Sequence, residues 1–213
     1  MTAKRRTDDL IRDLAARPVP AAWSPAATLG GMACAVAGML ALFWIVFGLR
    51  ADLGPALGRV PVQAKTVLPF ALSCLAGGLA LASARPGGRV RLWPLALPLV
   101  PGAVLVVLRI AQGGASPLMA ELVGSTAPAC IASISLMSLV PLAAGLLLAR
   151  RAAPTRPALT GALLGLAAGG GIAAGYALHC TEDSPLFFMT WYGLGICAAT
   201  VTGAFAGGRM LRW

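Results

Sequence analysis

Charged and titratable side chains are scarce in this sequence. Asp, Glu, Lys and Arg make up 11% of its 213 residues, whereas soluble domains have about 25%. It has one histidine and no Cys-x-x-Cys sequence, which excludes a zinc cluster of the usual Cys/His spacing. Five cysteines in this length also exclude the disulfide framework of a small secreted protein. Hydrophobic residues, in contrast, make up 58% of the chain, which indicates a lipid environment.

The first twenty residues lack the apolar core of a signal peptide. They read MTAKRRTDDLIRDLAARPVP, in which basic residues are followed by an acidic, helix-like stretch and two prolines. We therefore expect no cleaved leader.

Long apolar runs dominate the rest of the chain. A helix needs roughly 20 apolar residues to cross a hydrocarbon core about 30 Å thick. Six runs meet this requirement, near residues 27–49, 65–84, 93–111, 126–149, 158–178 and 189–208. Pro94, Pro98 and Pro101 predict a kink or a broken first turn in the third run. The expected fold is an all-α, polytopic bundle of six transmembrane helices.

The basic residues lie mostly on one side of this topology. Thirteen of the 17 Lys and Arg residues fall in the N-terminal segment, the second and fourth connectors and the C-terminus. By the positive-inside rule, both termini are cytoplasmic. We expect a cytoplasmic segment at 1–25, a membrane domain at 26–209 and a short tail at 210–213. The net charge of +10 then reflects topology, and no direct nucleic-acid binding is expected.

Glycines are spaced by four in the last two runs, at Gly161, Gly165 and Gly169 and at Gly203 and Gly207. Small residues at this spacing let helix backbones approach closely in lipid. The pattern favours packing within the bundle, and a homo-oligomer through the same ridge stays open. No Asp, Glu or His lies at mid-span, and Arg109 is expected to extend alone to the outer interface.

The five cysteines differ in predicted depth. Cys34, Cys74 and Cys197 lie inside apolar runs and are expected to be inert core residues. Cys130 and Cys180 lie near the outer face, where they could form a disulfide, bind a soft metal ion or have no role. The polar side chains next to Cys180 could tune its thiol or simply form a hairpin turn: His179, Glu182 and Asp183.

The N-terminal segment predicts a short amphipathic helix. In TDDLIRDLA, residues 7–15, a capping threonine and first-turn acids precede apolar residues that share one face. A helix this short is marginal alone in water, so it needs a binding surface. A cytoplasmic protein groove suits its three aspartates better than an anionic membrane. A helix without a partner stays open.

These features together resemble the NrsF-like family of bacterial inner-membrane anti-sigma factors. The segment at 7–15 leads into six spans, HCTEDSP at 179–185 follows the fifth, and WYGL at 191–194 opens the sixth. The chain ends in the basic RMLRW at 209–213. The resemblance covers the whole chain.

The resemblance implies a protein without enzymatic activity or cofactor that holds a SigF-type extracytoplasmic-function sigma factor at the inner membrane. It implies sigma binding by residues of the N-terminal segment: Asp8, Asp9, Leu10, Ile11, Asp13 and Leu14. It also implies that Cys130 and Cys180 face the periplasm and respond to heavy metals or oxidants.

Two other classes compete with this interpretation. A small-molecule or metal transporter could use the outer cysteines as an entry site, but polar mid-membrane groups are missing. A membrane thiol oxidoreductase would be expected to carry a Cys-x-x-Cys sequence.

Overall fold

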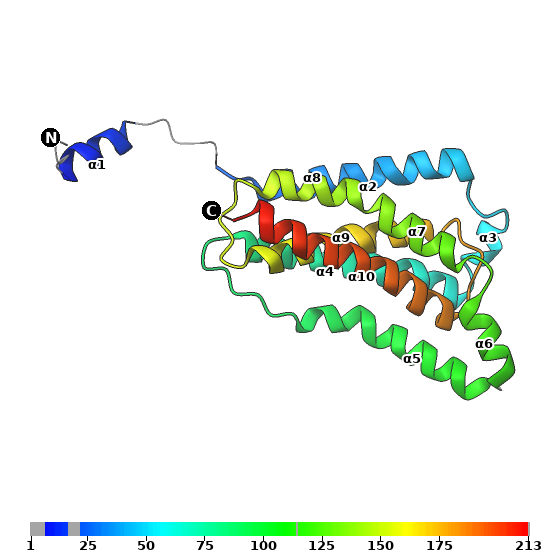
Figure 1. The fold of residues 1–213 in the computed structure, drawn as a ribbon. Helices are drawn as coiled ribbons and strands as arrows, with labels where there is room; N and C mark the ends of the chain where they lie inside the picture. Colours follow the sequence, from blue (N-terminus) through cyan, green and yellow to red (C-terminus); the bar gives the residue numbers. More distant parts are fainter. Residues whose placement is uncertain (1–6, 17–21, 114, 213) are drawn as a thin grey trace.

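A computed structural model describes residues 7–16, 22–113 and 115–212. Every regular element in these ranges is helical, as the sequence predicts (Figure 1). The elements are α1 (Thr7–Ala15), α2 (Pro25–Phe47), α3 (Leu53–Ala56), α4 (Val60–Ala84), the 3-10 turn η1 (Trp93–Leu95), α5 (Ala96–Gln112), α6 (Ala115–Val123), α7 (Ala127–Met137), α8 (Leu139–Ala149), α9 (Pro157–Tyr176) and α10 (Pro185–Met210). The expected segment 1–25 and tail 210–213 are thus described only in part.

Six segments are long and apolar enough to cross a membrane: Pro25–Phe47, Val60–Ala84, Trp93–Gln112, Leu118–Ala149, Pro157–Tyr176 and Pro185–Met210. Proline in the first turn marks several of these starts, because its missing N–H costs nothing there: Pro25, Pro61, Pro157 and Pro185. The second segment begins five residues before the predicted boundary at Lys65, because this charge is paired inside the bundle.

The third and fourth segments are interrupted, although only the first interruption is expected from the sequence. The third opens with the 3-10 turn η1, which confirms the broken first turn predicted from its prolines. The fourth consists of α6, α7 and α8, with a break at Ser138 between the last two. Pro141 follows within the first turn of α8, and the buried Ser138 hydroxyl donates to the Ile134 carbonyl. This break lies between Cys130 and the helix that packs on α2.

The glycine-rich helix α9 lies at the centre and packs most extensively on α10 and α4. A Cβ at Gly161 would collide with the Gly203 carbonyl, and one at Gly203 with the Gly161 carbonyl. The spaced glycines therefore pack within the chain. Helix α2 packs chiefly on α8, while the outer faces expose large apolar side chains such as Ile45 and Val201.

The bundle has two distinct ends (Figure 1). We call the one formed by residues 48–59, 115–126 and 177–184 the hairpin end, after the turn between α9 and α10. The other, where α2 begins and α10 ends, is the terminal end. Helix α1 stands apart from the bundle, beyond the terminal end (Figure 1).

The close packing of α9 on α10 should be sensitive to one added methyl group. We expect Gly203→Ala to lower stability by about 1–3 kcal/mol through overpacking, since its Cβ would meet the Gly161 backbone. Gly193→Ala, on the same helix, has open space around the added Cβ and should have little effect. Thermal unfolding in detergent measures both, and equal midpoints would contradict the contact.

Candidate sensor site

The structure brings together the two cysteines that the sequence places on one face. Cys130 lies in the first turns of α7, and Cys180 lies in the hairpin 177–184. Their Sγ atoms are 3.9 Å apart, although the two residues are 50 positions apart in the chain. Both residues are buried, with exposed fractions of 0% and 4%. The two thiols are in hydrogen-bond contact, so a two-electron oxidant that removes both thiol protons could join them as a disulfide after a further approach of the sulfurs.

Aromatic side chains enclose the thiol pair. Tyr176, Phe187 and Tyr192 are almost wholly buried and belong to the same apolar cluster as the two cysteines. The rings of Tyr176 and Tyr192 lie 5.8 Å apart. The Tyr192 hydroxyl is buried and makes no hydrogen bond within the described ranges. The pair is therefore shielded from bulk water, so that only a small reagent would reach it.

A buried lysine supports the hairpin backbone at Cys180 and Glu182. The Lys65 side chain, on α4, is 0% exposed. Its ammonium donates to the carbonyls of Cys180 at 2.6 Å and Glu182 at 3.0 Å, and to the Asp183 carboxylate at 2.7 Å. All three ammonium donors are thus used within the hairpin, which offsets the cost of burying the charge.

Lys65 belongs to a larger set of charges that we call the cation cluster: Arg50, Asp52, Arg59, Lys65 and Asp183. Arg50 binds both carboxylates and also donates to the Cys180 carbonyl at 3.2 Å. Hydrogen bonds from Arg50 lower the pKa of Asp52 to about 2. With three cations and two carboxylates, the cluster carries one net positive charge beside Cys180.

The Cys180 thiol lies outside the helices, and its surroundings favour the thiolate. Its pKa is lowered to about 6, chiefly because Cys130 can donate a hydrogen bond to the sulfur. Burial opposes this shift, and the positive charge of Lys65 adds to it. The thiolate is the nucleophilic form of cysteine. The site thus pairs a reactive sulfur with a second sulfur in hydrogen-bond contact.

The other predicted site residues of the hairpin anchor it to neighbouring loops. His179 Nδ1 lies 2.8 Å from the Gly48 carbonyl oxygen. The Glu182 carboxylate accepts from the backbone N–H of Ser125 at 3.0 Å and from its hydroxyl at 2.8 Å. Asp183 is the acceptor at the centre of the cation cluster. Within the described ranges, no group of three or more His, Cys, Asp or Glu side chains could hold a metal ion. A soft ion bound by Cys130 and Cys180 would therefore have these two sulfurs as its ligands.

The sequence does not reveal the roles of Arg50 and Lys65. In the sequence they are only two of the four basic residues on the side of the membrane that carries few of them. Two other expectations need correction. Arg109 does not extend alone, because Glu121 forms a salt bridge with it. Glu121 also accepts from the Ser184 hydroxyl at 2.9 Å, which ties α6 to the hairpin.

The second correction concerns the remaining thiols: Cys34, Cys74 and Cys197 are exposed on helix surfaces and are not core residues. An apolar run does not reveal which of its faces is buried, because lipid and protein interior select similar side chains.

The predicted sigma-binding residues lie on α1. Leu10, Ile11 and Leu14 are about half exposed, at 48%, 58% and 55%. Asp9 forms a solvent-exposed ion pair with Arg12 at 3.7 Å, and Asp13 is exposed on the same helix. The side chain of Asp8 lies outside the described part of the chain. These three apolar side chains form a stripe along α1 that is accessible at its surface.

The Asp183 contacts predict a pH-dependent stability. Burial alone would raise the pKa of Asp183, but hydrogen bonds from Arg50 and Lys65 outweigh it and the pKa is lowered. A carboxylate with a depressed folded-state pKa stabilises the fold above its ordinary value near 3.9, and this contribution is lost as the pH falls through the lowered pKa. We expect Asp183→Asn to lower the unfolding midpoint at pH 7 and to flatten its fall as the pH drops below the ordinary aspartate pKa. A parallel pH profile would contradict the ion pairing.

Fold and site together describe a multi-helix protein with a paired-thiol centre, and the comparisons place it among negative regulators of sigma factors. The family model "Negative regulator of sigma F" matches residues 13–213, so the chain belongs to this family. It is 37% identical to the anti-sigma-F factor NrsF of Caulobacter vibrioides, and 34% identical to the probable anti-sigma-F factor NrsF of Azospira oryzae. Each alignment covers 98% of this chain and 100% of the relative. No solved structure matches.

Proposed function

We propose that this protein is an inner-membrane anti-sigma factor. It binds a SigF-type extracytoplasmic-function sigma factor through its N-terminal segment and releases it when the Cys130–Cys180 pair reacts. The observation that carries the proposal is the buried sulfur pair, 3.9 Å apart, at the hairpin end. The candidate binding helix α1 lies at the opposite end (Figure 1).

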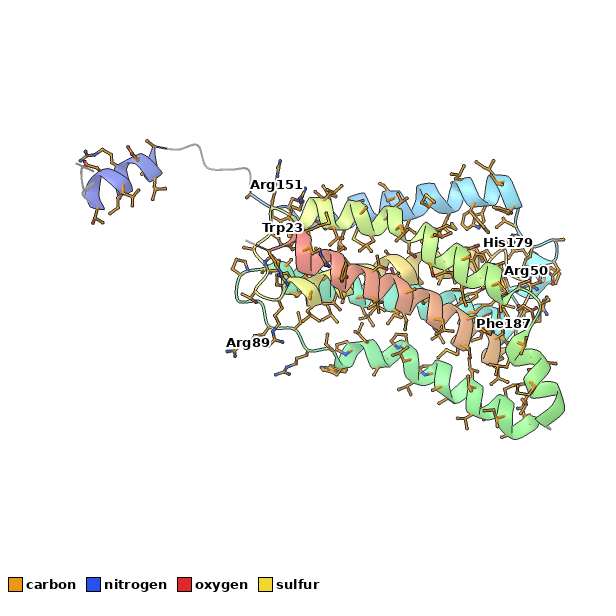
Figure 2. All side chains as sticks on the ribbon, in the orientation of Figure 1. Trp23, Arg50, Arg89, Arg151, His179 and Phe187 are labelled. Atoms are coloured by element: carbon orange, nitrogen blue, oxygen red, sulfur yellow. The ribbon has the colours of Figure 1, made fainter. Side chains whose placement is uncertain are left out.

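The charge distribution supports a membrane orientation with both termini inside. Basic side chains gather at the terminal end, where Figure 2 labels Arg89 and Arg151. Cations at this end fit the cytoplasmic side by the positive-inside rule. In this orientation α1 meets cytoplasmic partners and the thiol pair lies on the periplasmic side.

The open stripe of α1 supports sigma binding. Leu10, Ile11 and Leu14 occupy positions i, i+1 and i+4 of one helix face, which suits insertion into an apolar groove. Asp9 and Asp13 would face basic residues at the rim of that groove. Ordering of a short helix on contact lowers affinity, so that a modest signal suffices for release.

The trigger in this proposal is formation of a disulfide between Cys130 and Cys180. The sulfurs must close from 3.9 Å to about 2.0 Å, the length of an S–S bond. Closure would draw α7 and the hairpin together. It would also remove the negative charge from Cys180 and leave the positive charge of the cation cluster unbalanced.

Helix α2 is the element that would carry this change to α1. Its end is joined to the hairpin by three contacts: His179 Nδ1 with the Gly48 carbonyl, the Arg50 N–H with the Leu178 carbonyl at 3.2 Å, and the Arg50 guanidinium with the Cys180 carbonyl. Along its length α2 packs chiefly on α8, which continues from α7 beyond the break at Ser138. Both cysteines are thus linked to α2.

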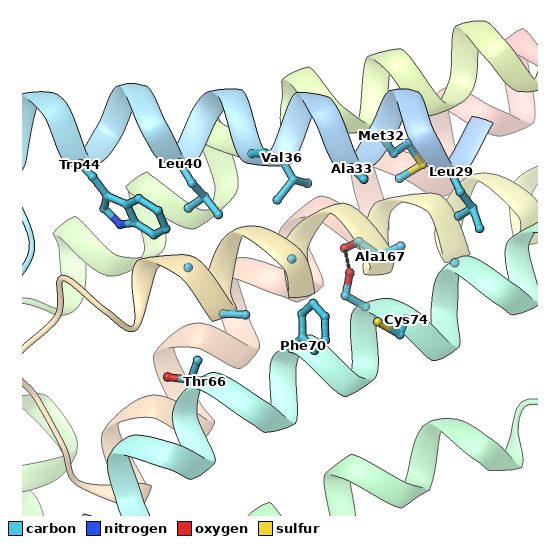
Figure 3. A pocket seen from close by; sticks show the side chains of 16 residues that line it. Leu29, Met32, Ala33, Val36, Leu40, Trp44, Thr66, Phe70, Cys74 and Ala167 are labelled. Atoms are coloured by element: carbon cyan, nitrogen blue, oxygen red, sulfur yellow. Dashed lines mark hydrogen bonds between the residues drawn. The ribbon is translucent and has the colours of Figure 1, made fainter. Parts of the chain in front are cut away.

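A cavity beside α2 gives this helix room to move. It has a volume of about 720 Å³ and lies between α2, α4 and α9 (Figure 3). Leu40 and Val36 of α2 point into it, opposite Phe70 of α4 (Figure 3). Its lining is almost wholly apolar, and the Ser73 hydroxyl is already bonded to the Ala167 carbonyl. A shift of α2 here would break few polar contacts.

Removal of residues 1–17 tests the binding half of the proposal. The full-length chain and the truncated chain, both in membrane vesicles, are each incubated with a SigF-type sigma factor, and the retained sigma factor is measured. We expect the truncated chain to retain less than a tenth of the sigma factor. Equal retention would place the binding surface elsewhere.

A further inference from the structure

We infer that Lys65 makes Cys180 the sulfur that attacks an oxidant and leaves Cys130 as the resolving thiol. This inference rests on the thiol-sensing function proposed above and adds an order of events and a positioning residue. The oxidant class is a hydroperoxide, a small molecule that could reach a pair shielded by aromatic rings.

The Lys65 ammonium lies close to Cys180. Its hydrogen bonds to the Cys180 and Glu182 carbonyls hold it against the hairpin backbone. Because the Lys65 side chain is 0% exposed, water screens its charge only weakly. A sulfur that carries negative charge is therefore stabilised at Cys180.

The other charged groups around Cys180 do not cancel the positive charge of Lys65. Asp183 is shared by Arg50, Arg59 and Lys65, so its negative charge is more than compensated. Glu182 is turned to the N–H and hydroxyl of Ser125. The groups that face Cys180 from the packed helices are Cys130 of α7, Tyr176 of α9 and Tyr192 of α10, which are neutral in their protonated forms. The uncompensated charge beside Cys180 is thus positive.

Cys130 has different surroundings. Its sulfur lies 3.7 Å from the Thr126 hydroxyl and 3.9 Å from Cys180, and the Tyr176 hydroxyl is a further polar neighbour. None of these three groups is a cation. Cys130 is also fully buried, whereas Cys180 keeps a small exposed fraction. Cys130 therefore suits the protonated partner that donates a hydrogen bond to Cys180.

The chemistry follows in two balanced steps. The Cys180 thiolate attacks one oxygen of the hydroperoxide, so that an S–O bond forms, the O–O bond breaks and the departing alkoxide or hydroxide takes a proton from water. Cys180 is oxidised by two electrons to a sulfenic acid, and the peroxide is reduced. The Cys130 sulfur then attacks Cys180. The S–S bond forms, the S–O bond breaks, and hydroxide leaves as water with the Cys130 proton.

Trapping of the sulfenic acid tests this order. The full-length protein in detergent, with Cys34, Cys74 and Cys197 replaced by alanine, is treated with hydrogen peroxide for set times. It is then unfolded in the presence of a cyclic diketone that labels sulfenic acids, so that the label need not enter the folded bundle. Cys130→Ser leaves Cys180 as the only thiol, and Cys180→Ser leaves Cys130. We expect Cys180 to be labelled at least tenfold faster than Cys130. Equal rates, or faster labelling of Cys130, would overturn the inference.

Lys65 is tested in the Cys130→Ser background. Lys65→Met should slow labelling of Cys180 about tenfold, and Lys65→Arg should restore it to within about threefold because the positive charge is kept. Arg109→Gln is the matched control, since it removes a cation at the same end of the bundle that pairs with Glu121 and lies outside the cation cluster, and less than a twofold change is expected. If Lys65→Met does not fold, Lys65→Gln is measured instead, because its amide can still donate to the hairpin carbonyls but carries no charge. An unchanged rate in the folded variant would overturn the role of Lys65.

The two proposals fail separately in these experiments. Labelling needs no sigma factor, so selective labelling of Cys180 without sigma release would contradict only the proposed function. Cysteine-dependent sigma release with first attack at Cys130 would contradict only the present inference.

Discussion

Serine in place of Cys130 or Cys180 should abolish induction and leave repression intact. Serine has nearly the size of cysteine and can hydrogen-bond, so the bundle should keep its packing, but it forms no disulfide. We expect transcription from a sigma-F-dependent promoter to rise less than twofold when the serine strains are exposed to hydrogen peroxide, and at least tenfold in the parent strain. Promoter activity in growing cells measures this.

The other thiols of the chain provide a matched control. Cys34 and Cys74 are exposed on helix surfaces and lie away from the pair, so Cys34→Ser and Cys74→Ser strains should respond like the parent. Normal induction in both the Cys130→Ser and the Cys180→Ser strains would exclude the pair as the sensor.

Glutamate in place of Leu10 and Leu14 should release the sigma factor without any stimulus. The two side chains are one helical turn apart on the open stripe of α1, and each is about half exposed. Because both side chains are about half exposed on the surface of α1, a charge there should not disturb the bundle, but its burial in a partner groove would be costly. We expect promoter activity of at least half that of a strain lacking the protein.

Arg12→Gln is the control for this double variant, because Arg12 is highly exposed and lies off the apolar stripe. It should repress normally. The amount of each protein in the membrane is measured in parallel, so that degradation is not mistaken for release. Full repression by the double variant at normal abundance would contradict binding through α1.

The sequence predicts the helical architecture well, because the thickness of a bilayer fixes the length of an apolar run. It also places Cys130 and Cys180 on one face, since topology alone decides this. It does not reveal their 3.9 Å separation, which depends on how α7 packs beside the hairpin.

Lys65 shows why buried charges escape sequence analysis. A rule based on hydropathy treats a lysine at the start of an apolar run as the boundary of the membrane. Here the lysine lies inside α4, because its ammonium is paired with Asp183, 118 residues further along the chain. Arg109 and Glu121 show the same effect over 12 residues. Such pairs become visible only when the tertiary contacts are known.

In the proposed mechanism, the state of one thiol pair at the hairpin end sets the affinity for a sigma factor at the terminal end. The most direct measurement is the dissociation constant of the sigma factor for the full-length protein in membrane vesicles, with the pair first reduced and then oxidised by hydrogen peroxide. We expect at least tenfold weaker binding after oxidation, which corresponds to about 1.4 kcal/mol, and no change in Cys130→Ser/Cys180→Ser. The same dissociation constant in both states, with the Cys130–Cys180 disulfide confirmed by peptide mapping, would contradict the account.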